Sequence, residues 1–135
     1  MAALNENAIT RLASVPSWSS QGAAGTETSL YTCPTGKVAL ITHVIMRVIS
    51  ASMATCVVTF GSITGDVNQF RGDTTLTNLD GTTKYAVIHM QAGTRNTPDG
   101  GTLVTAGTSF GVEVTTADAD GGSATIDVFG MLYDA

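Results

Sequence analysis

LYTCPTGKVALITHVIMRVIS, residues 30–50, is the stretch that decides the fold of this chain. It opens with a short strand pattern and a turn at Pro34-Thr35-Gly36, where proline pre-sets its own φ and glycine can adopt a left-handed conformation. The run Lys37–Ile49 follows and is rich in β-branched residues, which favour extended structure. This stretch therefore predicts a strand, a tight turn and one long strand.

The long strand is apolar on both of its faces. Side chains alternate between the two faces of a sheet, so one face carries Val38, Leu40, Thr42, Val44, Met46 and Val48, and the other carries Ala39, Ile41, His43, Ile45, Arg47 and Ile49. One face can pack into the core of a small domain, while the second needs another layer. That layer is either an N-terminal arm or a partner chain, so the pattern indicates a protein that assembles.

Alternating patterns in the rest of the chain predict further strands separated by turn residues. The clearest alternations are Thr55–Phe60, Lys84–Gln91, Thr108–Thr115 and Ser123–Tyr133. In Thr108–Thr115 the residues expected to face inward are Phe110, Val112 and Val114. About eight strands at this spacing predict an all-β fold, an antiparallel jelly-roll-like β-sandwich over residues 29–135.

Residues 1–28 predict an extended N-terminal arm, because their few apolar residues are scattered among polar ones. Trp18 is the only tryptophan, and a ring of that size is costly to leave in water. It is expected to dock either on its own domain or on a neighbouring chain, and Leu12 is expected to make similar contacts.

The composition excludes several classes of function. The 135 residues are enough for one domain with a single core, and the formal net charge of −5 argues against nucleic-acid binding, which needs Lys and Arg at the phosphates. No signal peptide and no membrane-spanning run is recognised. Only 13% of residues are charged, about half of the usual share, which fits a surface covered in an assembly or one rich in Thr and Ser.

Residues that could carry chemistry are few, and none has a complete motif. Cys33 and Cys56 could form a disulfide, but without export two buried thiols are the expectation. Neither His43 nor His89 has a further ligand at suitable spacing in its own segment, so a buried or interface histidine is expected. We therefore expect no enzyme, no cofactor and no metal site.

Three further patterns have simpler explanations. Arg71-Gly72-Asp73 spells an integrin-recognition tripeptide, but a turn is expected there. The segment from Asp118 to Gly122 resembles part of a calcium loop and lacks the remaining oxygen ligands, so a hairpin turn is expected. Glu113 and Asp127 are expected on outward faces of neighbouring strands, either solvated or paired with Arg47, Lys84 or Arg95.

Two segments carry a resemblance to a known group of proteins. Tyr31–Thr42, YTCPTGKVALIT, resembles the opening β-turn-β of small structural proteins of tailed bacteriophages. Ala106–Val114, AGTSFGVEV, together with Thr125–Gly130, TIDVFG, is similar to their closing hairpin. The resemblance covers roughly residues 30–133 in order and implies a jelly-roll virion component of the capsid decoration, or cement, type.

The resemblance implies a protein made in the host bacterial cytoplasm that binds the outer capsid surface of the virion. Its implied partners are the major capsid protein and further copies of itself in a dimer or trimer, with no nucleic acid and no membrane. The interface residues that we predict come from the arm, from one face of the long strand and from the C-terminal strand: Leu12, Trp18, Ile41, His43, Ile45, Arg47, Phe129, Met131 and Tyr133.

Two other functions remain open. One is the receptor-binding head of a tail fibre or spike, in which the polar loop Gly93–Gly101, GTRNTPDGG, would contact a cell-surface glycan through Arg95 or Asn96. The other is a carbohydrate-binding module, which would be expected to display a row of exposed aromatic rings.

Overall fold

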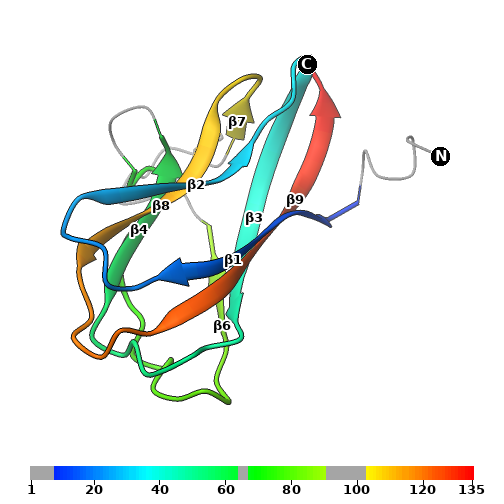
Figure 1. The fold of residues 1–135 in the computed structure, drawn as a ribbon. Coiled ribbons are helices and arrows are strands. Elements are labelled where there is room, and N and C mark those ends of the chain that lie inside the picture. The colour runs from blue at the N-terminus through cyan, green and yellow to red at the C-terminus, as the bar shows by residue number, and fades with distance from the viewer. Residues whose placement is uncertain (1–7, 64–66, 91–102) are drawn as a thin grey trace.

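The computed structural model describes residues 8–63, 67–90 and 103–135, and these residues form two antiparallel sheets packed face to face (Figure 1). Sheet A has the strand order β1-β9-β3-β6, with the short β7 also paired to β3, and sheet B has the order β2-β8-β4-β5. The strands are β1 (Thr10–Ser19), β2 (Thr26–Thr32), β3 (Lys37–Arg47), β4 (Val57–Ser62), β5 (Arg71–Thr75), β6 (Ala86–His89), β7 (Leu103–Thr105), β8 (Ser109–Thr116) and β9 (Ser123–Asp134).

The strand pairings nest inside one another. The first strand pairs with the ninth, the second with the eighth, the third with the sixth and seventh, and the fourth with the fifth. Such nesting is a long antiparallel hairpin rolled into two sheets, which is the jelly-roll arrangement. The predicted fold class is confirmed, and the described residues form nine strands because Thr10–Ser19, expected in an arm, is a strand as well.

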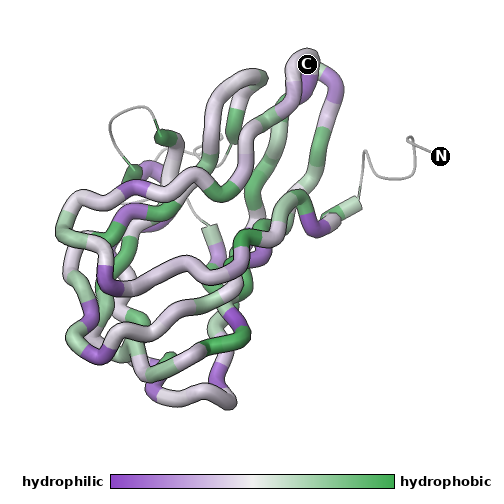
Figure 2. The backbone as a smooth tube through the Cα atoms, viewed as in Figure 1, coloured by the Kyte–Doolittle hydropathy of each residue, from purple (hydrophilic) through white to green (hydrophobic). Residues whose placement is uncertain are grey.

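The core fills the space between the two sheets. Sheet B contributes Phe60 from β4 and Phe110 from β8, whose ring centroids lie 6.1 Å apart. Phe70 also contacts Phe110, at a centroid separation of 5.5 Å. Phe110, Val112 and Val114 are buried as predicted. Figure 2 shows hydrophobic residues recurring along β3 and β9, the two central strands of sheet A.

A β-bulge in β3 changes which residues face the core. Ile41 pairs with Gly130 and His43 with Phe129, so Thr42 is an extra residue on β3. A bulge of this kind shifts the alternation by one position. The core side chains are therefore Ala39 and Ile41 before the bulge and Val44 and Met46 after it. The predicted strict alternation along Lys37–Ile49 is wrong beyond Ile41, and Ile49 is also buried.

The N-terminal segment differs from the expected arm. Thr10–Ser19 is strand β1, which pairs with β9 from Thr10 opposite Gly130 to Ser19 opposite Ser123. Thr26 begins β2, so the expected boundary between residues 28 and 29 falls inside a strand of the domain. Trp18 docks on its own domain, where 5% of it is exposed. The physical reason is that Leu12, Ala13, Val15 and Trp18 pack against the core, although Ile9 is exposed.

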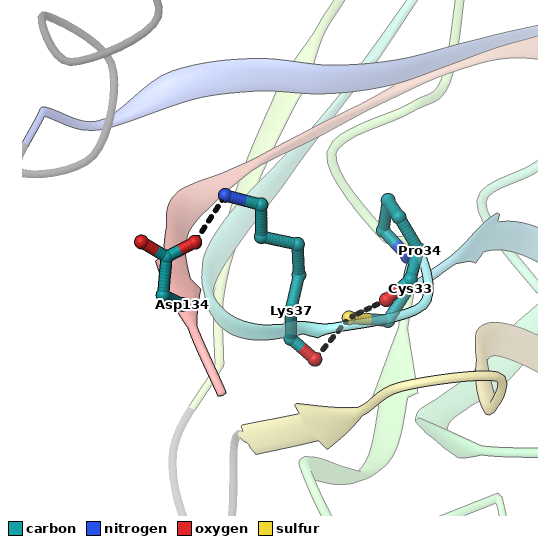
Figure 3. A network of polar contacts seen from close by, with 4 residues as sticks. All are labelled: Cys33, Pro34, Lys37 and Asp134. Carbon is teal, nitrogen blue, oxygen red and sulfur yellow. Dashed lines mark hydrogen bonds and ion pairs between the residues drawn. The ribbon is translucent and has the colours of Figure 1, made fainter.

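The turn between β2 and β3 has the predicted geometry. Lys37 donates its backbone N–H to the carbonyl of Pro34 at 3.2 Å, and Gly36 has a φ of 77°. The Cys33 thiol donates to the carbonyl of Lys37 at 3.3 Å, and the Lys37 ammonium pairs with the carboxylate of Asp134 at the end of β9 (Figure 3). Cys33 and Cys56 are both buried free thiols, as expected.

Arg71-Gly72-Asp73 lies in β5 and not in a turn, which corrects the expectation for this tripeptide. Val58 pairs with Thr74 and Phe60 with Arg71, so β5 carries one residue more than β4 across this interval. The Gly-Asp pair thus marks a bulge in an edge strand, where glycine is well tolerated.

Candidate assembly surface

The outer face of sheet A is the side turned away from sheet B. This face is made by the outward-facing positions of four strands. They are Val38, Leu40, His43, Ile45 and Arg47 of β3; Asp127, Phe129, Met131 and Tyr133 of β9; Val87 and His89 of β6; and Leu103 of β7. The register sets these residues in rows across the strands. One row joins Leu103, Leu40 and Met131, and the next joins His89, His43 and Phe129.

This face is apolar and has no second layer over it among the described residues. Its side chains on β3 and β9 are mostly half-buried by one another, and the β6 and β7 side is open, with Val87 and Leu103 each 44% exposed. Tyr85, just before β6, and Val48, just after β3, are also exposed. Contiguous exposed apolar surface of this kind marks interaction sites in soluble proteins.

The outer face of sheet B is different. Its central row places Glu27 of β2 opposite Glu113 of β8, and Glu113 opposite Thr59 of β4. Ser29 and Thr115 occupy outward positions on the neighbouring rows, while Ile63 and residues 67–69 lie over Gly111 and Gly61, so the part of this face left open is mainly polar and acidic. Of the two outer faces, that of sheet A therefore carries more partly exposed apolar side chains on its strands.

A cluster of rings lies at the centre of the outer face of sheet A. The His43 ring stacks on Phe129 with centroids 4.8 Å apart and an interplanar angle of 3°, and the His89 ring lies 5.8 Å from His43. The Thr42 hydroxyl contacts Nδ1 of His43 at 2.9 Å. Burial, followed by the electrostatic effect of the nearby His89, lowers the pKa of His43.

Beside the rings, Asp127 is a buried carboxylate with two donors. Arg47 Nε donates to one of its oxygens at 2.6 Å, and the Ser14 hydroxyl donates to the other at 2.6 Å. Burial acts to raise the pKa of Asp127, but these hydrogen bonds and the charges of Arg47 and Arg11 lower it overall. The expected Arg47 pairing is confirmed. Glu113, however, lies in the other sheet, so the two carboxylates are not on neighbouring strands.

The structure brings together six of the nine predicted interface residues on the outer face of sheet A: His43, Ile45, Arg47, Phe129, Met131 and Tyr133. The other three belong to the core side. Ile41 is 1% exposed, Trp18 is buried, and Leu12 packs half-buried against the core. Ile41 faces the core because of the bulge at Thr42. Leu12 and Trp18 lie on the core side because β1 is part of sheet A.

Sequence reasoning missed Leu40, Val87 and Leu103 as members of this face. Leu40 shares its outward phase with His43 only because of the bulge, which leaves no clear signal in the sequence. Val87 and Leu103 join the face through the pairing of β6 and β7 with β3, which connects segments far apart in the chain.

A small groove lies between β5 and β6. It holds about 210 Å³ and is lined by Arg71, Thr74, His89 and neighbouring residues. Its volume is below the roughly 300–1,000 Å³ of typical small-molecule pockets.

Within residues 8–63, 67–90 and 103–135, no three His, Cys, Asp or Glu side chains gather as metal ligands, and no helix could cross a membrane. The loop Gly93–Gly101, with Arg95 and Asn96, lies outside the described residues.

The fold is similar to that of two capsid chains from bacteriophages. A chain from the capsid of Ralstonia phage GP4 matches with a TM-score of 0.56 and 18% identity, covering 91% of this chain and 83% of that one. A chain from the capsid asymmetric unit of cyanophage Pam1 matches with a TM-score of 0.50 and 16% identity, covering 91% and 84%. No protein-family model and no curated protein matches the sequence.

Proposed function

We propose that this chain is a structural protein of a bacteriophage virion. In this proposal it acts as a decoration, or cement, protein that binds the outer surface of the capsid and stabilises the head by bridging neighbouring capsomers. Its partner is a capsid subunit, and the surface that it uses is the outer face of sheet A.

The single observation that carries the proposal is the difference between the two outer faces. A sandwich needs one apolar side per sheet for its core, and sheet A has apolar residues on both of its sides. Leu40 and Met131 still leave part of their apolar surface open to solvent, and a partner that covers this surface would account for it. The likeness to two phage capsid chains supports a capsid as the place where that partner is found.

The energetics suit a reinforcing role. Burying apolar surface contributes about 25 cal/mol per Å² before the costs of association are subtracted, and a standard interface covers about 800 Å² on each partner. One such contact gives moderate affinity, whereas the same contact repeated at every equivalent position of a capsid opposes rupture at many places at once. A dimer or trimer of this chain would add a bridge between capsomers.

The test is binding of the purified protein to expanded capsids of the phage that encodes it. We expect saturable binding and an increase in the temperature at which the capsids rupture. Val87→Asp places a charge on the outer face of sheet A at a position exposed enough for the fold to accept it, and it should reduce capsid affinity at least about tenfold.

Ser29→Asp is the matched control, because it adds the same charge to the exposed outer side of sheet B. It should bind capsids as the unmodified chain does. Equal binding by the Val87→Asp and Ser29→Asp variants would show that sheet A is not the docking side. No binding by the unmodified chain would remove the decoration role.

A further inference from the structure

We propose that His43 and His89 form a binding site for a divalent transition-metal ion on the outer face of sheet A. The two residues are the only histidines of the chain. They lie on different strands, β3 and β6, and the register places them directly opposite one another. The proposal concerns the isolated protein and does not depend on its role in a virion.

The backbone pairing brings the two side chains close. Met90 donates its N–H to the carbonyl of Thr42 at 2.9 Å, so the ladder hydrogen bonds flank His43 and His89 instead of joining them. Residues in such non-hydrogen-bonded pairs have the closest side chains of an antiparallel ladder. The ring centroids are 5.8 Å apart. Two imidazoles on one tetrahedral ion, with metal–nitrogen bonds of about 2.0–2.1 Å, hold their centroids roughly 5 Å apart, which is close to the separation of this pair.

The hydrogen bonds of Thr42 fix which nitrogen of His43 is available. The Thr42 hydroxyl has a single proton and donates it to the carbonyl of Phe129 at 3.2 Å. We assign the hydroxyl proton to that bond, so the oxygen accepts from His43 and Nδ1 is the protonated nitrogen of the neutral ring. Nε2 then carries the free lone pair. Metal-binding histidines have this arrangement, in which one nitrogen is anchored by a hydrogen bond and the other binds the ion.

Phe129 holds the His43 ring in place. The two rings are stacked almost parallel, and β9 fixes Phe129 opposite His43. His89 is exposed, so an ion can reach the pair from solvent. Preorganised imidazoles with an open side suit Zn²⁺, Ni²⁺ and Cu²⁺.

The remaining ligands would be water, because the described residues place no third His, Cys, Asp or Glu at the pair. Asp127 is the nearest carboxylate on β9 by register, and it is already bound by Arg47 and Ser14. Arg71 of β5 donates to the carbonyl of His89 at 3.4 Å and opposes a cation there. A site with two protein ligands and a nearby guanidinium implies moderate affinity.

The experiment is isothermal titration of the untagged protein with Ni²⁺ at pH 7.5, followed by Cu²⁺ and Zn²⁺. We expect one ion per chain, with Cu²⁺ bound more tightly than Ni²⁺ or Zn²⁺. His89→Ala and His43→Ala should each abolish this binding. Thr42→Val removes the hydroxyl that orients His43 and should weaken binding about tenfold.

The control variant is Tyr133→Phe, which changes the same face without touching the histidines and should bind as the unmodified chain does. Thermal unfolding without metal verifies that each variant is folded, and His89→Ala replaces an exposed side chain, so its fold should be retained. Nitrogen NMR of the imidazoles should report His43 with its proton on Nδ1 and a shift of both rings on Zn²⁺ addition. Undiminished Ni²⁺ binding by His89→Ala, or no binding by the unmodified chain, would overturn the site.

Discussion

Val48, at the end of β3, combines a φ of 55° with 66% exposure. A β-branched residue in the left-handed region is strained, typically by about 1–3 kcal/mol, and glycine adopts that region freely. We predict that Val48→Gly raises the free energy of unfolding by about 1 kcal/mol, measured by urea denaturation.

Val87→Gly is the matched control for this change. Val87 is also an exposed valine, but it lies in β6 with a negative φ, so glycine there should lower the free energy of unfolding. If both substitutions destabilise the protein by similar amounts, Val48 stores no backbone strain.

Asp118 is a second single residue with a measurable effect. Its carboxylate accepts hydrogen bonds from the Thr55 backbone and hydroxyl, both at 3.1 Å, and from the Asp120 N–H, and these tie the β8–β9 turn to the loop before β4. Burial acts to raise the pKa of Asp118, but these hydrogen bonds lower it overall. The ionised form thus stabilises the fold above the unfolded pKa of about 4, and this contribution is lost as the pH falls through the lower folded pKa.

Asp118→Asn removes the titrating group while keeping one acceptor oxygen. We predict that it lowers the free energy of unfolding by about 1 kcal/mol at pH 7 and has a smaller effect near pH 2. Urea denaturation at both pH values measures this. A loss of equal size at the two pH values would contradict the role of the ionised carboxylate.

At the scale of elements, Gly130 sets how closely β9 lies against its neighbours. A Cβ atom at this position would come within 2.2 Å of the carbonyl oxygen of Leu40 in β3 and 3.1 Å of Leu12 Cδ1 in β1. Backbone cannot move aside easily there, because β9 is paired on both edges. We predict that Gly130→Ala lowers the free energy of unfolding by about 2 kcal/mol or more.

Gly72→Ala provides the comparison for Gly130→Ala. A Cβ at Gly72 meets nothing within 4 Å, and its φ is not in the left-handed region. It should change stability by about 0.5 kcal/mol or less. A similar loss for both alanines, seen as equal shifts of the thermal midpoint, would mean that the close approach of β3 to β9 is not what constrains Gly130.

The alternation of apolar and polar residues predicts the facing of side chains in β8 and β9 but not throughout β3. The inward and outward residues of β8 and β9 follow from simple alternation and were predicted from the sequence. In β3 the alternation fails at Thr42, because the extra residue is defined only by the pairing with β9. A bulge depends on the partner strand, and no local pattern announces it. Because of this one extra residue, Leu40 lies on the outer face and Ile41 faces the core.

For the whole molecule, the sequence predicted the fold class but not the role of its N-terminus. Turn spacing and alternation were enough to predict a jelly-roll-like sandwich. The weak apolar pattern of Thr10–Ser19 becomes a strand only because β9 offers it an edge, and that edge is distant in sequence. A variant that lacks residues 1–25 would therefore lose β1. Weaker capsid binding by that variant would report damage to the fold and not the loss of a docking contact.

The histidine pair is likewise a property of the whole fold. Neither His43 nor His89 has ligand spacing within its own segment, and the β3–β6 register alone makes them neighbours. The apolar outer face is partly visible in the sequence, since Phe129, Met131 and Tyr133 share one phase of β9. Its completion by β6 and β7 required the tertiary structure.

Oxidative footprinting of the protein, free and capsid-bound, shows whether the outer face of sheet A is the side covered on the capsid. Met131 and Tyr133 report on sheet A, and Ile63, which lies over Gly111 on the outer side of sheet B, reports on sheet B. We predict that capsid binding protects Met131 and Tyr133 from oxidation several-fold while Ile63 is oxidised at the same rate in both states. Protection of Ile63 with Met131 and Tyr133 unchanged would show that sheet B is the covered side.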